Sequence, residues 1–174
     1  MWTGSRSAGV LLYGTTGVTV ENNNIYDTDD GIILSRVVAS AIVRGNNLHD
    51  NLETGIQLED GATNTTITGN TITGNDVAGI RFAGAADPID IARCAGNSIC
   101  LDPTNSSNGL DTPPGTGNVA HTNIFSGNGF GVVNWDSFLG QIFDAANNWW
   151  GNASGPTHTS NPTGTGELVS DNVA

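Results

Sequence analysis

Short segments of similar, largely apolar sequence recur along this chain, and each begins at a glycine. The segments that start at Gly31, Gly55 and Gly79 read Gly-Ile-Ile-Leu, Gly-Ile-Gln-Leu and Gly-Ile-Arg-Phe and lie 24 residues apart. A related segment, Gly-Val-Leu-Leu, starts at Gly9, which is 22 residues earlier. Alternation with a period of two residues is typical of a β-strand, because successive side chains point to opposite faces. Each segment is therefore predicted to form a short strand.

The segment at 55–59 shows the alternation most clearly. Ile56 and Leu58 are predicted to point into a core, and Gln57 and Glu59 are predicted to face water. The same arrangement one interval later would bring outward polar residues of neighbouring repeats side by side.

A second marker repeats with the strands, a triplet of the form Asn-Asn-apolar or close to it. The first residues of these triplets are Asn23, Asn46, Asn70, Asn97, Thr122 and Asn147, at steps of 23, 24, 27, 25 and 25 residues. Apolar residues also recur at one fixed position relative to these triplets, which is predicted to point inward. They form a column of Val20, Val43, Ile67, Cys94 and Val119. A repeat of this length indicates a solenoid or a propeller rather than an irregular globular fold.

Strands this short can pair with the equivalent strand one repeat later, in parallel and in register, at a step of about 4.8 Å. Asparagine suits such a stack, because it tolerates the left-handed backbone of a tight corner and its amides hydrogen-bond along a ladder. We therefore expect an all-β parallel β-helix of about six coils of roughly 24 residues. Residues 1–174 would form a single domain, with a loop insertion at 101–118 and a closing coil or tail at 146–174.

The stretch 67–75, Ile-Thr-Gly-Asn-Thr-Ile-Thr-Gly-Asn, followed by Gly-Ile-Arg-Phe at 79–82, resembles the repeat of right-handed parallel β-helix proteins of the pectate-lyase-like superfamily. The resemblance covers nearly the whole chain. The segment 146–151, Ala-Asn-Asn-Trp-Trp-Gly, also looks like the closing coil of bacterial and archaeal surface modules of this kind. The resemblance implies a right-handed coil but not one function, since the superfamily includes polysaccharide-degrading enzymes and non-catalytic adhesin or stalk modules.

Charge narrows the range of partners. The formal net charge is −12, with five Arg and no Lys, which argues against nucleic acids and anionic membranes because both need cationic patches. No membrane span and no signal peptide are visible, and an extracellular or cell-surface location is expected from the composition and the resemblance. No cap precedes the first strand, so we expect either a segment of a larger secreted protein or a module that stacks end to end with neighbouring β-helix segments.

The two cysteines occupy different positions in the repeat and are predicted to point to opposite sides of the coil wall. Cys94 lies in the inward column, whereas Cys100 follows the inward Ile99 and should point outward. Two thiols on opposite sides of the wall are poorly placed for a disulfide, so a buried free Cys94 is favoured, and a bridge would need a distorted coil.

Acidic residues gather in the turn that holds Asp27, Asp29 and Asp30, and Asp50 and Glu53 occupy nearly the same turn one repeat later. Stacking would bring Asp29 close to Glu53. Neighbouring carboxylates require a cation, a shared proton or separation by solvent, so a Ca²⁺ site is one hypothesis. The alternative is that acidic turns are ordinary in an acidic protein.

The same acids are candidates for catalysis, because the string 27–31, Asp-Thr-Asp-Asp-Gly, faintly resembles the aspartate motif of polygalacturonases. On that resemblance Asp29, Asp30 and Glu53 would supply the acid and base of glycoside hydrolysis. The other motifs of that family are missing. A lyase would need a cationic base, for which Arg81 is the candidate, although a surface ion pair between Arg81 and Glu59 is the simpler interpretation.

Aromatic residues are candidates for contact with sugar rings. Trp149 takes the inward position and is predicted to plug the last coil, which leaves Trp135 and Trp150, together with the outward Gln57 and Glu59, as candidate ligand-binding residues.

The sequence thus predicts a non-catalytic, extracellular, structural or carbohydrate-contacting module. The alternative is a polysaccharide lyase or glycoside hydrolase, or a fragment of one.

Overall fold

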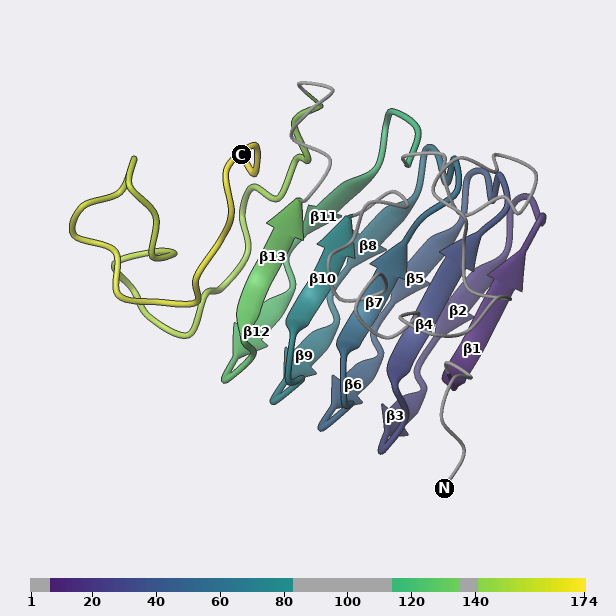
Figure 1. Cartoon of the computed structure of the whole chain (residues 1–174), viewed down its shortest axis with the longest axis horizontal. Coiled ribbons are helices and arrows are strands. Elements are labelled where there is room, and N and C mark those ends of the chain that lie inside the picture. The colour runs from purple at the N-terminus through teal and green to yellow at the C-terminus, as the bar shows by residue number, and fades with distance from the viewer. Residues whose placement is uncertain (1–6, 83–113, 135–140) are drawn as a thin grey trace, which may run out of the picture.

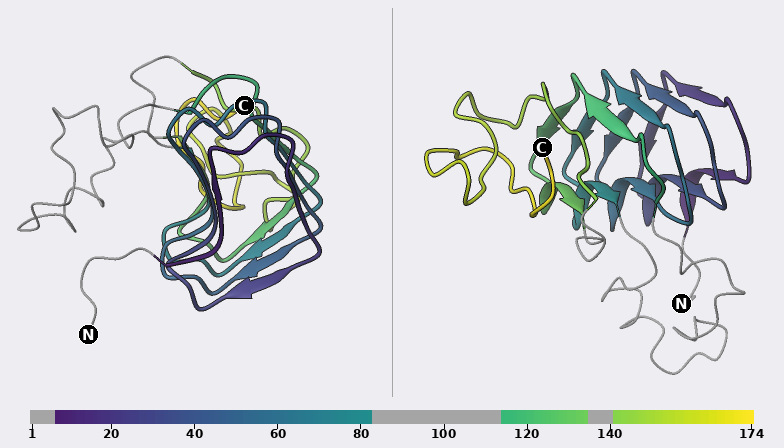
Figure 2. Two further views of the ribbon diagram at one scale, coloured as in Figure 1. Left: turned by 90° about the vertical axis from the view of Figure 1, so that its right-hand side faces the viewer. Right: turned by 90° about the horizontal axis from the view of Figure 1, so that it is seen from above.

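The computed structural model describes residues 7–82, 114–134 and 141–174. In these ranges the chain winds into a parallel β-helix with three strands to a coil, and the coils stack along one axis (Figures 1 and 2). None of the residues described forms a helix that could cross a membrane.

The strands are β1 (Ala8–Tyr13), β2 (Thr19–Glu21), β3 (Asn24–Tyr26), β4 (Asp30–Ser35), β5 (Ile42–Arg44), β6 (Asn47–His49), β7 (Thr54–Leu58), β8 (Thr66–Thr68), β9 (Thr71–Thr73), β10 (Ala78–Phe82), β11 (Val119–His121), β12 (Ile124–Ser126) and β13 (Phe130–Asn134). They form a five-stranded sheet, β1-β4-β7-β10-β13, and two four-stranded sheets, β2-β5-β8-β11 and β3-β6-β9-β12.

Every strand pairs in parallel with its equivalent in the next coil. In the five-stranded sheet Ile32 lies opposite Ile56, and Ile56 lies opposite Ile80. The segments that begin at Gly31, Gly55 and Gly79 are therefore strands β4, β7 and β10, and the predicted pairing across one repeat is confirmed.

Apolar residues from all three sheets fill the interior as columns of similar side chains. The inward residues of the five-stranded sheet are Leu12, Ile32, Leu34, Ile56, Leu58, Ile80, Phe82 and Val132. The two other sheets contribute Val20, Val43, Ile67, Ala120, Ile25, Leu48, Ile72 and Phe125. Burial of these columns against one another is the hydrophobic contribution that holds successive coils together.

The stack differs from the prediction at one place. Strand β8 pairs directly with β11, so that Ile67 lies opposite Ala120. The predicted triplet at Asn97 lies outside the described residues. The inward column accordingly passes through Ala120 and not through Val119, because a shift of one residue moves a strand residue to the other face. The predicted sites at Cys94, Cys100 and Trp135 and most of the predicted loop at 101–118 lie outside the described residues.

The last strand is followed by a segment that closes the interior. Bridges join Asp144 to Val119 and Trp149 to Ile124. Inside the coil the Phe143 ring stacks on Phe82, with ring centroids 5.1 Å apart. Residues 168–174 return to this end, where Val169 pairs with Val132 and Val173 pairs with Phe143.

Candidate functional site

A ladder of asparagine side chains runs along the inside of one corner of the coil. Its members are Asn23, Asn46, Asn70, Asn123 and Asn148. In the middle of the ladder, Asn70 Oδ1 accepts hydrogen bonds from the backbone N–H of Asn46 at 2.9 Å and from Asn46 Nδ2 at 3.0 Å. Asn70 Nδ2 donates to the Val43 carbonyl at 3.0 Å and to Asn123 Oδ1 at 2.9 Å. The buried amides thus satisfy one another and the backbone at the corner.

This ladder passes through Asn123 and Asn148, one residue later than the triplets predicted at Thr122 and Asn147. The residues immediately before the ladder adopt positive φ, namely Asn22, Gly45, Gly69, Thr122 and Asn147. The left-handed conformation expected of the ladder asparagine therefore belongs to its predecessor, and the ladder residue itself serves as a hydrogen-bonding group.

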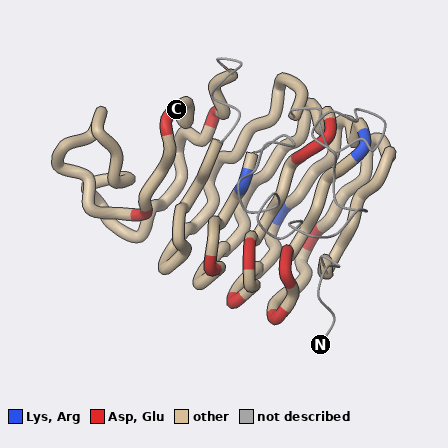
Figure 3. Tube along the Cα trace, in the orientation of Figure 1, with Lys and Arg blue, Asp and Glu red and all other residues tan. Residues whose placement is uncertain are grey.

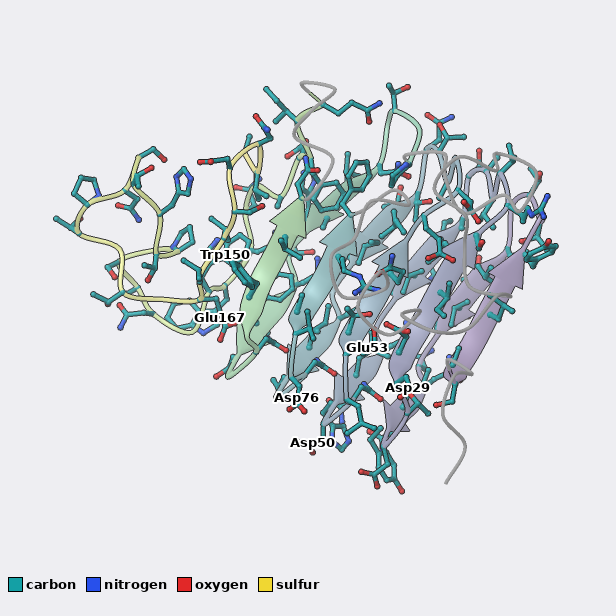
Figure 4. All side chains as sticks on the ribbon, viewed as in Figure 1. Asp29, Asp50, Glu53, Asp76, Trp150 and Glu167 are labelled. Atoms are coloured by element: carbon teal, nitrogen blue, oxygen red, sulfur yellow. The ribbon has the colours of Figure 1, made fainter. Side chains whose placement is uncertain are left out.

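A second ladder, which the sequence analysis missed, lies five residues further along each coil. Asn51, Asn75 and Asn128 are joined by Nδ2-to-Oδ1 bonds of 2.8 Å. Thr28 begins this ladder, and the Glu167 carboxylate ends it by accepting from the backbone N–H and side-chain Nδ2 of Asn128 (Figure 4). The constant offset of five residues from Asn46, Asn70 and Asn123 is the signal that could have revealed it.

The acidic side chains of this turn contact other parts of the protein. The Glu53 backbone N–H donates to the Asp29 carbonyl at 2.7 Å, so the two residues are neighbours in the stack as predicted. Their side chains have different partners. Asp29 accepts from the backbone N–H and hydroxyl of Ser7, Asp30 accepts from the Thr54 hydroxyl, and Glu53 Oε2 lies 3.6 Å from Arg81 Nη2.

The remaining metal candidates, Asp27 and Asp50, are exposed. Asp50 Oδ2 lies 2.7 Å from His49 Nδ1. Among the described residues no group of three or more His, Cys, Asp or Glu side chains is arranged to hold a metal ion. The Ca²⁺ hypothesis therefore has no assembled ligand set in this part of the chain.

Gln57, Glu59 and Arg81 lie on the outer side of the five-stranded sheet, but they do not face water. Their exposed fractions are 2%, 7% and 0%. Arg81 Nε donates to Gln57 Oε1, and Gln57 Nε2 donates to Glu59 Oε2 at 3.3 Å. The prediction of exposed polar side chains here was wrong, and a pair of Arg81 and Glu59 could not lie at the surface, because both residues are buried. The period-2 pattern reports the face of the sheet on which a side chain lies, not whether solvent reaches that face.

The sheet β3-β6-β9-β12, by contrast, presents an open outer face. Here the Tyr26 and His49 rings stack with centroids 5.0 Å apart and planes 13° apart, and Tyr26 is 50% exposed. Asn47 Nδ2 donates to Asn24 Oδ1 at 2.6 Å, and His49 Nε2 lies 3.2 Å from the same oxygen. These contacts join the two rings and the two amides on the same outer face of the sheet.

Trp149 extends this face at the other end of the sheet. It bridges to Ile124, and the two side chains are 48% and 46% exposed. Trp150, predicted as a ligand contact, is instead buried and stacks on Phe125 at 4.9 Å (Figure 4). The prediction that Trp149 plugs the last coil was wrong by one residue, because the ladder residue of this coil is Asn148 and not Asn147.

We call this surface the aromatic face. It consists of Asn24, Tyr26, Asn47, His49, Thr71, Thr73, Ile124, Ser126 and Trp149. The sequence analysis overlooked Tyr26 and His49, although each follows an inward apolar residue of an asparagine triplet by one position. That position is outward in a strand with period 2, which is the signal that could have identified them.

The neighbouring sheet, β2-β5-β8-β11, carries ion pairs on its outer surface. Arg44 Nη2 lies 2.6 Å from Glu21 Oε2, and His121 Nε2 lies 2.9 Å from Asp144 Oδ1. The hydrogen bond from the His121 side chain lowers the pKa of the Asp144 carboxyl below its ordinary value, and the backbone N–H of Ala146 acts in the same direction. These charges are paired within the sheet, which distinguishes it from the aromatic face.

Comparison with known proteins bears on the fold. A family model described as a right handed beta helix region matches residues 2–95, which is more than half of the chain. Comparison with curated proteins and with solved structures gave no match. The match shows the family and its fold.

Proposed function

The chain belongs to the right-handed β-helix family, and from this premise we propose that it is a non-catalytic module that contacts polysaccharide through the aromatic face. In this proposal the coil is a rigid spacer, part of a larger protein at the cell surface or outside the cell, where polysaccharides are encountered. A net charge of −12 without lysine disfavours nucleic acids and anionic lipids as partners.

The observation that carries the proposal is the presence of half-exposed aromatic rings at both ends of one polar sheet. Tyr26 and Trp149 lie four rungs apart, a span of about 19 Å at the spacing of parallel strands. Exposed aromatic faces suit the apolar side of a pyranose ring. Between the two aromatic ends, Asn47, Thr71 and Thr73 offer side-chain groups that can hydrogen-bond sugar hydroxyls.

The acidic residues support a non-catalytic role. Asp29, Asp30 and Glu53 each have a separate protein partner, and Asp30 and Glu53 are fully buried. A glycosidase needs two carboxyl groups that flank the scissile bond.

The proposal is tested by affinity electrophoresis of the chain in gels that contain neutral, amino-bearing or uronate polysaccharides. Tyr26→Ala and Trp149→Ala should each weaken binding about tenfold or more, since stacking contributes about 1–3 kcal/mol per ring in comparable systems. Tyr13→Ala is the matched control, because Tyr13 is 56% exposed but lies on β1 of another sheet. Absence of retardation by every polysaccharide, or an equal loss in the Tyr13 variant, would refute the proposal.

One observation favours an enzymatic alternative, namely the acid and the cation that lie together on the five-stranded sheet. Glu53 Oε2 and Arg81 Nη2 are 3.6 Å apart, and Arg81 also bonds Gln57. Both charged side chains are fully buried, so substrate would have to reach them through a rearrangement. Release of soluble oligosaccharides by the chain, abolished in Glu53→Gln, would establish this alternative.

A further inference from the structure

We infer that the aromatic face selects a polysaccharide with free amino groups, that is, a cationic amino-sugar polymer. The inference depends on the glycan-contacting function proposed above and adds the charge of the ligand to it. It comes from the residues that border the aromatic face rather than from those within it.

One long edge of the aromatic face is lined by acidic residues. Asp27 and Asp50 directly follow Tyr26 and His49, and the Asp27 N–H donates to the Asp50 carbonyl, so the two lie one above the other. In the next coil the position that matches Asp27 and Asp50 is Gly74, and Asp76 lies two residues further along that turn, where it is also exposed. Figure 3 shows acidic positions in a row along this edge, and Figure 4 labels Asp50 and Asp76 there.

Backbone conformation holds two of these acids at the edge. Asp27 and Asp50 adopt φ of 57° and 54°, in the left-handed corner column that continues through Gly74 and Gly127. The Asp50 carboxylate lies next to Gly74 of the following coil. A Cβ added at Gly74 would be 2.8 Å from Asp50 Oδ1. The acid is therefore held beside the aromatic rings and away from the interior.

The basic side chains described near this surface are fewer than its acids, and each already contacts an acid. Of the described residues close to the aromatic face, His49 lies against Asp50, and Arg44 is paired with Glu21 on the adjoining sheet. An anionic glycan such as a uronate would meet more acids than basic side chains along this edge. The ammonium group of an amino sugar whose ring stacks on Tyr26 would instead lie close to Asp27 or Asp50. Charge complementarity of this kind sets specificity.

The test uses three probes of equal length, a β-linked glucosamine oligomer, its N-acetylated counterpart and an oligogalacturonate, titrated into the whole chain by calorimetry. At low salt the amino oligomer should bind about tenfold more tightly than the acetylated one, and the uronate should bind least. The preference should fall as salt is raised to about 0.5 M, because screening weakens interactions between exposed charges.

Asp50→Asn should reduce the preference for the amino oligomer severalfold, since asparagine also tolerates positive φ and removes only the charge. Asp171→Asn is the matched control, because Asp171 is also exposed and also lies beside a histidine, His158, at 3.1 Å. This control should leave the preference unchanged.

The outcomes separate the two proposals. Equal binding of the amino and acetylated oligomers, or tighter binding of the uronate, would overturn the inference and leave the glycan-contacting function standing. An equal effect of Asp50→Asn and Asp171→Asn would also overturn it, because net charge would then explain the preference. If none of the three probes binds, the inference fails, and the affinity electrophoresis described above, which includes neutral polysaccharides, decides whether the glycan-contacting function stands.

Discussion

Adjacent asparagines in this chain have opposite roles, and their positions relative to the coil wall decide which role each takes. Asn46 is 2% exposed and makes bonds to three coils, whereas Asn47, the next residue, is exposed and bonds only Asn24 among the described side chains. Composition alone cannot separate the two. A buried amide without its partner has a large free-energy cost, while an exposed amide exchanges its partner for water.

The pair provides a direct comparison of these energies. Asn46→Ala removes acceptors and donors from buried backbone and side-chain groups, so the free energy of unfolding should fall by about 3 kcal/mol. Asn47→Ala should lower it by less than about 1 kcal/mol. Urea denaturation of the two variants measures both values. Similar losses in the two variants would mean that the buried ladder adds no stability beyond that of a surface amide.

At the scale of the strand, most of the architecture follows from the sequence. The spacing of Gly31, Gly55 and Gly79 predicts the strands β4, β7 and β10 and their pairing, because period 2 and a constant repeat admit few other arrangements. After residue 83, which residues point inward and which point outward could not be predicted in the same way. A slip of one residue between Thr122 and Asn123 reverses inside and outside, and this exchanged the roles of Trp149 and Trp150.

The glycines at the second position of β4, β7 and β10 are needed for a reason that the sequence pattern does not show. A Cβ on Gly55 would lie 2.8 Å from the Gly79 carbonyl oxygen and 2.7 Å from Ile72. We expect Gly55→Ala to destabilise the chain by about 3 kcal/mol through this overpacking. Gly69→Ala is the comparison, since Gly69 has φ of 64° but no atom within 4 Å of its Cβ position, and strain alone should cost about 1 kcal/mol. The order of the two urea midpoints checks the prediction, and the reverse order would show that φ, not close approach, selects glycine.

At the scale of the whole molecule, the three sheets have different uses. The five-stranded sheet buries its outer polar residues, the β2-β5-β8-β11 sheet pairs its charges, and the β3-β6-β9-β12 sheet leaves rings and amides open. The closing segment contributes to both stability and recognition, because Trp150 fills the end of the core and Trp149 completes the aromatic face. Trp149 and Trp150 are thus adjacent in sequence, yet Trp150 contributes to the stability of the coil and Trp149 to contact with a partner.

Substitution of the two tryptophans should show this separation. Trp150→Ala removes a ring that is 8% exposed and stacked on Phe125, so the free energy of unfolding should fall by about 3–5 kcal/mol. Trp149→Ala removes a ring that is 48% exposed, so it should change stability by less than about 1 kcal/mol while it weakens polysaccharide binding about tenfold. Urea denaturation and affinity electrophoresis of the same two proteins provide the readings. If Trp149→Ala destabilised the coil as much as Trp150→Ala does, Trp149 would be a packing residue, and the aromatic face would lose one of its two ends.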